Sequence, residues 1–335
     1  MTVAALLLVY AAGFGTLGPR MLARAKWTAR APLLAIVTYL AAAWSVVAAV
    51  WLAGLTLAVH ATVLSGALSQ LIGACVLRLR ATYATPGGAA LAAAGLVLSG
   101  AVVARTVLTA VGHLRAARRQ ALRHAQTARL VGRPDAALGV VLVGHPQPTA
   151  YCVAGRHPTV ILTTGALQAL DPAQLDAVLA HERAHLAWRH HQMLAVARIG
   201  RRVLPFLPLL RDVEVQVERL VELHADDAAI RARDPGSLAT ALVVLASAAS
   251  SASDGSAGGS ASAVLAAAAG PATALAATAT DAVQRINRLL RPAEPLAGLR
   301  RQLLRALAAG LALLSVLLAM APAMQALALG RVPRA

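Results

Sequence analysis

Long uncharged apolar runs alternate with arginine-rich segments along this chain of 335 residues. A helix of about 20 residues crosses the hydrocarbon core of a bilayer, and the runs have about that length. The first run precedes its basic residues, whereas a signal peptide carries its positive charge first, so we expect a retained helix. The pattern predicts about four transmembrane helices, at residues 2–18, 32–59, 89–111 and 306–329.

The arginines indicate how these helices are oriented. They gather in three segments beside the apolar runs, at residues 20–30, 115–133 and 291–305. Basic loops stay on the cytoplasmic side, where all three lie if three spans precede the central region and one follows it. Residues 61–77 are apolar enough for a further span. That span would place the second basic segment outside, so we interpret these residues as interfacial or re-entrant.

This layout predicts three parts. We expect residues 1–112 to form a three-helix membrane region, residues 113–300 a cytoplasmic domain, and residues 301–335 a C-terminal transmembrane helix. In the middle part, residues 193–210 mix apolar and basic positions as an amphipathic element does. Residues 247–280 are rich in Ala, Ser and Gly, which indicates a linker or a weakly packed helix.

Composition supports a membrane protein. The chain is 58% hydrophobic with a mean hydropathy of +0.66, far above that of an ordinary soluble domain. The net charge of +17 is also typical of nucleic-acid-binding proteins. However, the arginines lie beside apolar runs and no nucleic-acid-binding motif is present, so we expect a lipid bilayer and no nucleic acid as partner. Cys75 and Cys152 give no disulfide framework.

An H-E-x-x-H pattern occupies residues 181–185, within a segment (171–191) that predicts one helix. The segment opens with Asp, Pro and Gln at the positions of a capped helix start. Residues four apart share a helix face, so His181 and His185 can bind one metal ion. Glu182 would then lie beside the ion, placed to take a proton from water, as in zinc peptidases. The plain alternative is two ordinary surface histidines.

A second polar element points to the same metal. Zinc in a hydrolase usually takes three protein ligands, and Glu222 is our third. Asp226 lies one helical turn later, where it can accept the spare ring N–H of a ligating histidine. Glu218 and His224 are rival ligands. The alternative for Glu222 is a solvated position paired with a nearby arginine.

These two elements, H-E-x-x-H and Glu222-Leu223-His224-Ala225-Asp226, resemble the signature of membrane gluzincins. The relevant families are the M48 peptidases (CAAX prenyl protease and HtpX type) and the M56 peptidases (beta-lactam-sensing antirepressor type). The short gap between the elements looks more like M56. The resemblance implies one zinc ion per chain on His181, His185 and Glu222, with Glu182 as general base and Asp226 behind a ligand. His190 departs from relatives, which often carry Asp there.

The resemblance implies a mainly α membrane protein with a small α+β zincin-like catalytic domain between the third and fourth spans. Residues 149–164 predict a β-hairpin. The resemblance implies that residues 160–164 run along the cleft edge and pair with the substrate backbone. Tyr151, His224 and Arg231 are candidates for stabilising the oxyanion. A core strand is the plain alternative for residues 160–164.

The expected function is a zinc metalloendopeptidase of the cell membrane. Its M56 resemblance implies regulatory cleavage of a cytoplasmic protein, such as a transcriptional repressor. One alternative is quality control of membrane proteins, as in the HtpX type. Another is a non-catalytic signalling scaffold with a structural metal, although a structural site would be closed by four protein ligands.

Overall fold

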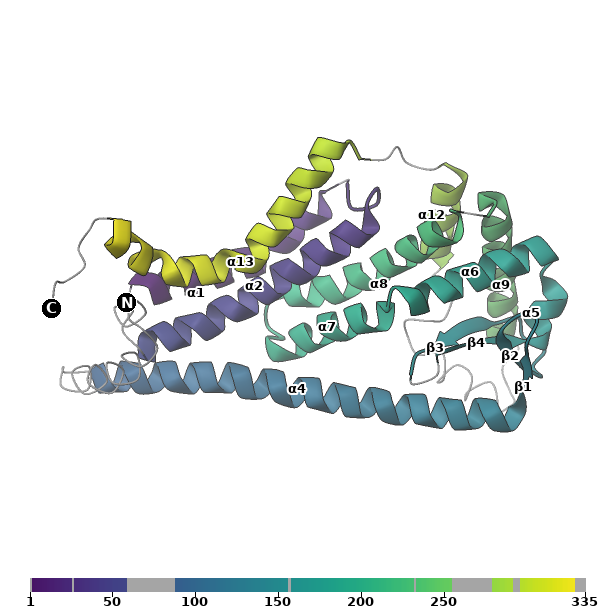
Figure 1. The fold of residues 1–335 in the computed structure, drawn as a ribbon, viewed down its shortest axis with the longest axis horizontal. Helices are drawn as coiled ribbons and strands as arrows, with labels where there is room; N and C mark the ends of the chain where they lie inside the picture. Colours follow the sequence, from purple (N-terminus) through teal and green to yellow (C-terminus); the bar gives the residue numbers. More distant parts are fainter. Residues whose placement is uncertain are drawn as a thin grey trace.

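The computed structural model is mostly helical, with one small sheet in its described part (Figure 1). This agrees with the predicted mainly α fold. Residues 61–77 lie outside the described residues, so their prediction is untested. The structure describes residues 2–25, 27–58, 88–155, 158–231, 233–254, 279–291 and 296–328.

In the described residues, each of the four predicted apolar runs lies in a long helix. The first three helices are long and apolar enough to cross a membrane, by length and composition. The fourth contains the predicted last span, whose crossing remains a prediction. The helices are α1 (Thr2–Ala23), α2 (Pro32–Ala58), α4 (Gly88–Val131) and α13 (Gly298–Ala328).

The second basic segment is not the loop that we expected. Helix α4 continues without a break through residues 115–131 and leads directly into the sheet at Gly132. Ala, Leu, Arg and Gln dominate this stretch, and all four favour helix. No Gly or Pro interrupts it before Gly132. The predicted boundary at 112/113 therefore falls inside one helix, which extends along one side of the molecule (Figure 1).

The predicted hairpin of residues 149–164 is confirmed as two antiparallel strands of a four-stranded sheet. The sheet order is β1-β2-β4-β3, and β2 pairs parallel with β4. The strands are β1 (Gly132–Asp135), β2 (Val140–Val143), β3 (Ala150–Val153) and β4 (Thr159–Thr163).

The expectation that residues 160–164 line the cleft is wrong. Strand β4 is internal, because β2 and β3 occupy both of its edges, and its residues 160–163 are buried. Such a continuous buried run is typical of a central strand. Strand β3 is one of the two edge strands of the described sheet, and it packs against the helix that carries the H-E-x-x-H pattern.

The segment predicted as one helix over residues 171–191 is two helices. Helix α6 (Pro172–Ala187) ends at Trp188, and α7 (His190–Val203) begins after Arg189. Arg189 adopts the left-handed conformation, with φ of 52°. Such a backbone is unfavourable for a non-glycine residue. This turn redirects the chain and places His190 against α6.

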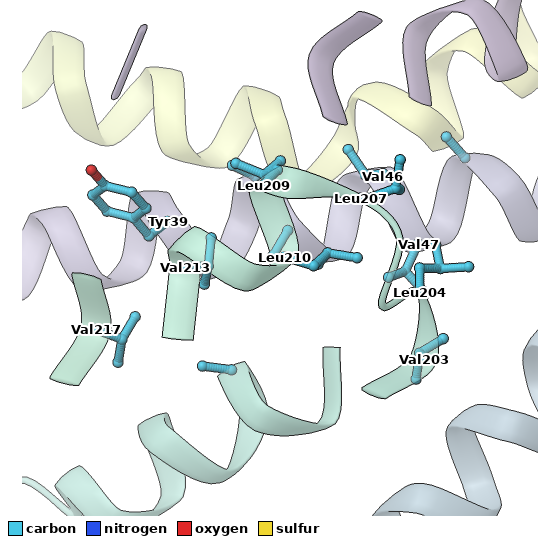
Figure 2. Packing of buried hydrophobic residues seen from close by; sticks show 14 of the residues in the cluster. Tyr39, Val46, Val47, Val203, Leu204, Leu207, Leu209, Leu210, Val213 and Val217 are labelled. Atoms are coloured by element: carbon cyan, nitrogen blue, oxygen red, sulfur yellow. The ribbon is translucent and has the colours of Figure 1, made fainter. Parts of the chain in front are cut away.

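Helix α8 (Pro208–Ala229) connects the site to the membrane helices through one hydrophobic core. Residues 193–210 form α7 and the start of α8, and their apolar side packs against α2, as an amphipathic element should. Figure 2 shows Leu204, Leu207 and Leu210 beside Val46 and Val47 of α2.

Three further helices complete the described part. Helix α5 (Thr164–Ala169) follows β4, and α9 (Pro235–Asp254) packs on α6 and on α12 (Ala279–Leu290). The predicted linker, residues 247–280, is therefore helical at both ends. Its central residues 255–278 lie outside the described part.

Candidate metal centre

The helix that presents the H-E-x-x-H pattern begins at the predicted cap. The backbone N–H groups of Ala173 and Gln174 donate to Asp171 Oδ1 at 2.9 and 2.8 Å. In return, Asp171 N–H donates to Gln174 Oε1 at 3.1 Å, which completes a capping box. The cap fixes the register of α6. Leu175, Val178 and Leu179 then face the sheet, and both histidines face α8.

His181, His185 and Glu222 form a group in which one ligand atom of each lies within 4.8 Å of the others. The Nε2 atoms of the histidines are 3.2 Å apart. Glu222 Oε2 lies 3.5 Å from His181 Nε2, and Oε1 lies 3.6 Å from His185 Nε2. Two imidazole nitrogens and a carboxylate thus converge on one point.

The rival ligands do not join this group. Glu218 accepts a hydrogen bond from Arg198 Nη2 at 3.0 Å, on another part of α8. His224 contacts His190 instead of the two ligand nitrogens. Of the candidates on α8, only Glu222 reaches the ligand group in the described part of the chain.

Asp226 lies beside His181. Its Oδ1 is 3.0 Å from His181 Nδ1, an ion-pair distance, although the ring N–H is not aligned as a hydrogen bond requires. Burial alone would lower the pKa of His181, but the carboxylates of Asp226 and Glu222 outweigh it and raise the pKa to about 9. Asp226 is 1% exposed, so its charge needs a partner.

That partner is Arg285, which the sequence analysis missed. Its Nε and Nη2 donate to the two Asp226 oxygens at 2.8 and 2.6 Å, and its Nη1 lies 3.0 Å from Glu222 Oε2. Although burial opposes the charged form of Glu222, His181 and this guanidinium lower its pKa to about 2. Arg285 lies on α12, 59 residues from Asp226, so no local spacing could reveal it.

His185 has a different environment. Its Nδ1 is 3.0 Å from His190 Nδ1, and His190 Nε2 is 2.9 Å from His224 Nδ1. All three rings are buried. Burial lowers the pKa of His185 to about 4 and that of His190 to about 3, so both rings are neutral at pH 7.

Glu182 is 2% exposed and lies beside Cys152 of β3. Burial, reinforced by the nearby Glu222 carboxylate, raises the pKa of Glu182 to about 7 despite the opposing effect of His181. Burial and the Glu182 carboxylate also raise the pKa of the Cys152 thiol on β3. A carboxyl group with a pKa near neutrality can both accept and donate a proton at pH 7.

The three candidates for stabilising the oxyanion, Tyr151, His224 and Arg231, lie in different environments. Tyr151 packs with Val143 and Ile161 in a cluster separate from the one between the sheet and α6. Neighbouring residues of a strand point to opposite faces, and Cys152 points toward α6. Tyr151 therefore lies on the face of the sheet that is turned away from α6. Arg231 is exposed, and His224 is engaged by His190.

Residues 113–207 match the family model of Peptidase family M48. A plastoglobule-localized metallopeptidase 48 of Arabidopsis thaliana is 36% identical over 112 residues, 30% of this chain and 33% of that protein. A Protease HtpX homolog 1 of Streptomyces coelicolor is 36% identical over 77 residues, 22% and 25% of the two chains.

A Protease HtpX homolog of Moorella thermoacetica is 34% identical over 108 residues, 31% of this chain and 36% of that protein. The similarity thus covers 25% to 36% of the length of these three relatives. No solved structure matches the chain significantly. The expectation that M56 is the closer family is not supported, because the similarity is to M48 metallopeptidases and includes the H-E-x-x-H helix.

Proposed function

We propose that this protein is a membrane zinc metalloendopeptidase of the HtpX type, which cleaves protein or peptide substrates. The convergence of His181, His185 and Glu222 beside the buried Glu182 carries this proposal. Similarity to M48 metallopeptidases over residues 113–207 supports it. Quality control of membrane proteins, our alternative from the sequence, replaces cleavage of a repressor as the proposed role.

The donor set fits zinc. Two imidazoles and one carboxylate are the ligands of many catalytic zinc sites, which leave a further position open. His181, His185 and Glu222 would hold the ion, and Asp226 would orient His181. When bound, zinc polarises the scissile carbonyl and lowers the pKa of water. A non-catalytic scaffold is less consistent with this group, because structural zinc is usually enclosed by four protein ligands.

Glu182 is the proposed general base. It neighbours His181 on α6 and is buried, so it is held in place and shielded from bulk water. Its carboxylate takes the proton of the attacking water, and the resulting carboxylic acid returns a proton to the leaving amine. The raised pKa of Glu182, about 7, suits both steps at neutral pH.

Strand β3 is the proposed site of substrate pairing, in place of β4. It is one of the two edge strands of the described sheet, and it is the one that packs against α6 beside Glu182. An extended peptide can add to a free sheet edge through main-chain hydrogen bonds. A substrate held there would present its backbone to the catalytic carboxylate whatever its side chains are.

We propose that the catalytic part faces the cytoplasm, because the basic segments lie beside the apolar helices on one side. The test is a reporter that is active only in the cytoplasm. Fused after Arg133 it should be active, and fused after Arg80 it should be silent. The reverse pattern would place proteolysis on the outer side of the membrane.

The activity test compares the wild type with Glu182→Gln and Glu218→Gln, all purified in detergent with zinc. Labelled, unfolded casein serves as the probe. Glu182→Gln should cleave it a hundred- to ten-thousand-fold more slowly, as expected for loss of a general base. Glu218→Gln should cleave like the wild type, because Glu218 lies outside the ligand group. Equal rates for all three proteins would reject the proposed mechanism.

A further inference from the structure

Three buried histidines form a continuous chain that starts at a proposed zinc ligand. His185 comes from α6, His190 from α7 and His224 from α8. The chain runs from His185 Nδ1 to His190 Nδ1 at 3.0 Å, and from His190 Nε2 to His224 Nδ1 at 2.9 Å. The exposed fractions of the three residues are 6%, 1% and 3%. Water therefore has little access to these nitrogens.

The backbone turn between α6 and α7 positions His190 among the three histidines. Arg189 adopts φ of 52° between α6 and α7, an uncommon conformation for a residue with a side chain. The turn brings His190 back against His185, five residues earlier. The Trp188 and His224 rings form a T-shaped contact, with centroids 4.8 Å apart. Such local strain persists only where the surrounding structure maintains it.

Hydrogen-bond geometry determines where the protons lie once His185 binds a metal. His185 faces the other ligands with Nε2, so a neutral ring carries its proton on Nδ1. Two nitrogens 3.0 Å apart share one proton, so His190 Nδ1 accepts and His190 Nε2 carries the next proton. His190 Nε2–H in turn donates to His224 Nδ1.

We propose that His190 and His224 are positioning residues that hold His185 in the Nδ1–H tautomer, with Nε2 directed at the zinc. This inference rests on the proposed zinc site. A neutral acceptor at His190 lies beside His185 in the position that the Asp226 carboxylate occupies beside His181. The row of three histidines has a fixed direction, because His190 and His224 each accept a hydrogen bond at Nδ1 from the ring before it.

The alternative is that the three rings only fill space in the core. Substitutions can separate the two roles, because Asn places Oδ1 where His places Nδ1. His190→Asn keeps an acceptor for His185, whereas His190→Leu removes it at similar volume. His191→Asn is the matched control, since His191 is the exposed neighbour on the same helix.

The experiment uses the full chain in detergent, and zinc affinity is measured by competition with a chelating dye. His190→Leu should bind zinc about 10- to 100-fold more weakly, the usual effect of losing a partner of a metal-binding histidine. His190→Asn and His191→Asn should stay within about threefold of the wild type. His224→Leu should have a smaller effect than His190→Leu, because it acts through one more ring.

Nitrogen NMR of the zinc-loaded protein with ¹⁵N-labelled histidine is the second readout. It should show His185 protonated at Nδ1, with coupling across the hydrogen bond to His190 Nδ1. Equal zinc affinity of His190→Leu and the wild type would overturn the inference, as would a proton that belongs to His190 Nδ1. Failure of the zinc site itself is distinguishable, because zinc binding would then be unaffected by His181→Ala.

Discussion

The two histidines of the H-E-x-x-H pattern lie four residues apart on one helix, yet opposite kinds of chemistry support them. Behind His181 lies a buried ion pair, Asp226 with Arg285. Behind His185 lies a chain of neutral rings, His190 and His224. Both supports are almost fully buried, but only the first contains charge.

This difference indicates that the buried ion pair, unlike the neutral rings, also stabilises the fold. A buried charge that loses its partner destabilises a protein by several kcal/mol, whereas a lost neutral hydrogen bond costs far less. We therefore expect substitutions on the His181 side to affect both folding and zinc binding. Substitutions on the His185 side should affect mainly zinc binding.

The largest effect is expected for Arg285→Ala. It removes the buried guanidinium that pairs with both Asp226 and Glu222, and it should lower the free energy of unfolding by about 3–5 kcal/mol. Arg288→Ala is the control, because Arg288 pairs with the more exposed Asp227 on the same two helices. That change should cost about 1 kcal/mol.

Denaturant unfolding in detergent would measure both variants. Equal losses of stability would contradict the view that the ion pair at Arg285 and Asp226 is a main support of the fold. A variant that cannot be purified is still informative if Arg285→Lys, which keeps the charge but not the paired donors, has intermediate stability.

An intermediate effect is expected for Asp226→Asn. Asn keeps the shape and an oxygen for Arg285 but removes the charge behind His181. Zinc affinity should fall about 10- to 100-fold, and stability should fall as well. Asp227→Asn serves as control and should leave zinc binding unchanged. Competition with a chelating dye measures the zinc affinity of both variants. Equal zinc affinities of Asp226→Asn and the wild type would show that the carboxylate charge does not support His181.

The smallest effect on stability is expected for Trp188→Ala, which lies next to the neutral rings that support His185. It removes the edge contact with His224. Aromatic contacts of this kind contribute about 0.5–1.5 kcal/mol, and Trp188 is 39% exposed, so a loss of about 1 kcal/mol is expected. Zinc affinity should change less than in His190→Leu. A larger loss of affinity than in His190→Leu would show that orientation of His224 matters more than the acceptor on His190.

Features set by nearby residues were predictable from sequence. The capping box at Asp171, the helical spacing of His181 and His185, and the spacing of Glu222 and Asp226 each depend on residues within one or two helical turns. The apolar helices were predictable for the same reason, since hydropathy is a local property.

Features that depend on contacts between residues distant in sequence were not predictable from sequence. Arg285 reaches Asp226 from another helix, and β4 becomes central only because the four-residue strand β2 pairs with it. The turn at Arg189 contains neither Gly nor Pro, so nothing in the local pattern signals the end of α6. The chain of histidines depends on that turn, and for this reason the role of His190 was not apparent from sequence.

The most direct test of the central claim is the zinc content of the purified protein and of three variants. We predict about one zinc per chain in the wild type and in Glu182→Gln, because Glu182 is not a ligand. Glu222→Ala should lose most of its zinc, whereas Glu218→Ala should keep it. Full zinc occupancy in Glu222→Ala would contradict the proposed ligand set and, with it, the account of how the two histidines are supported.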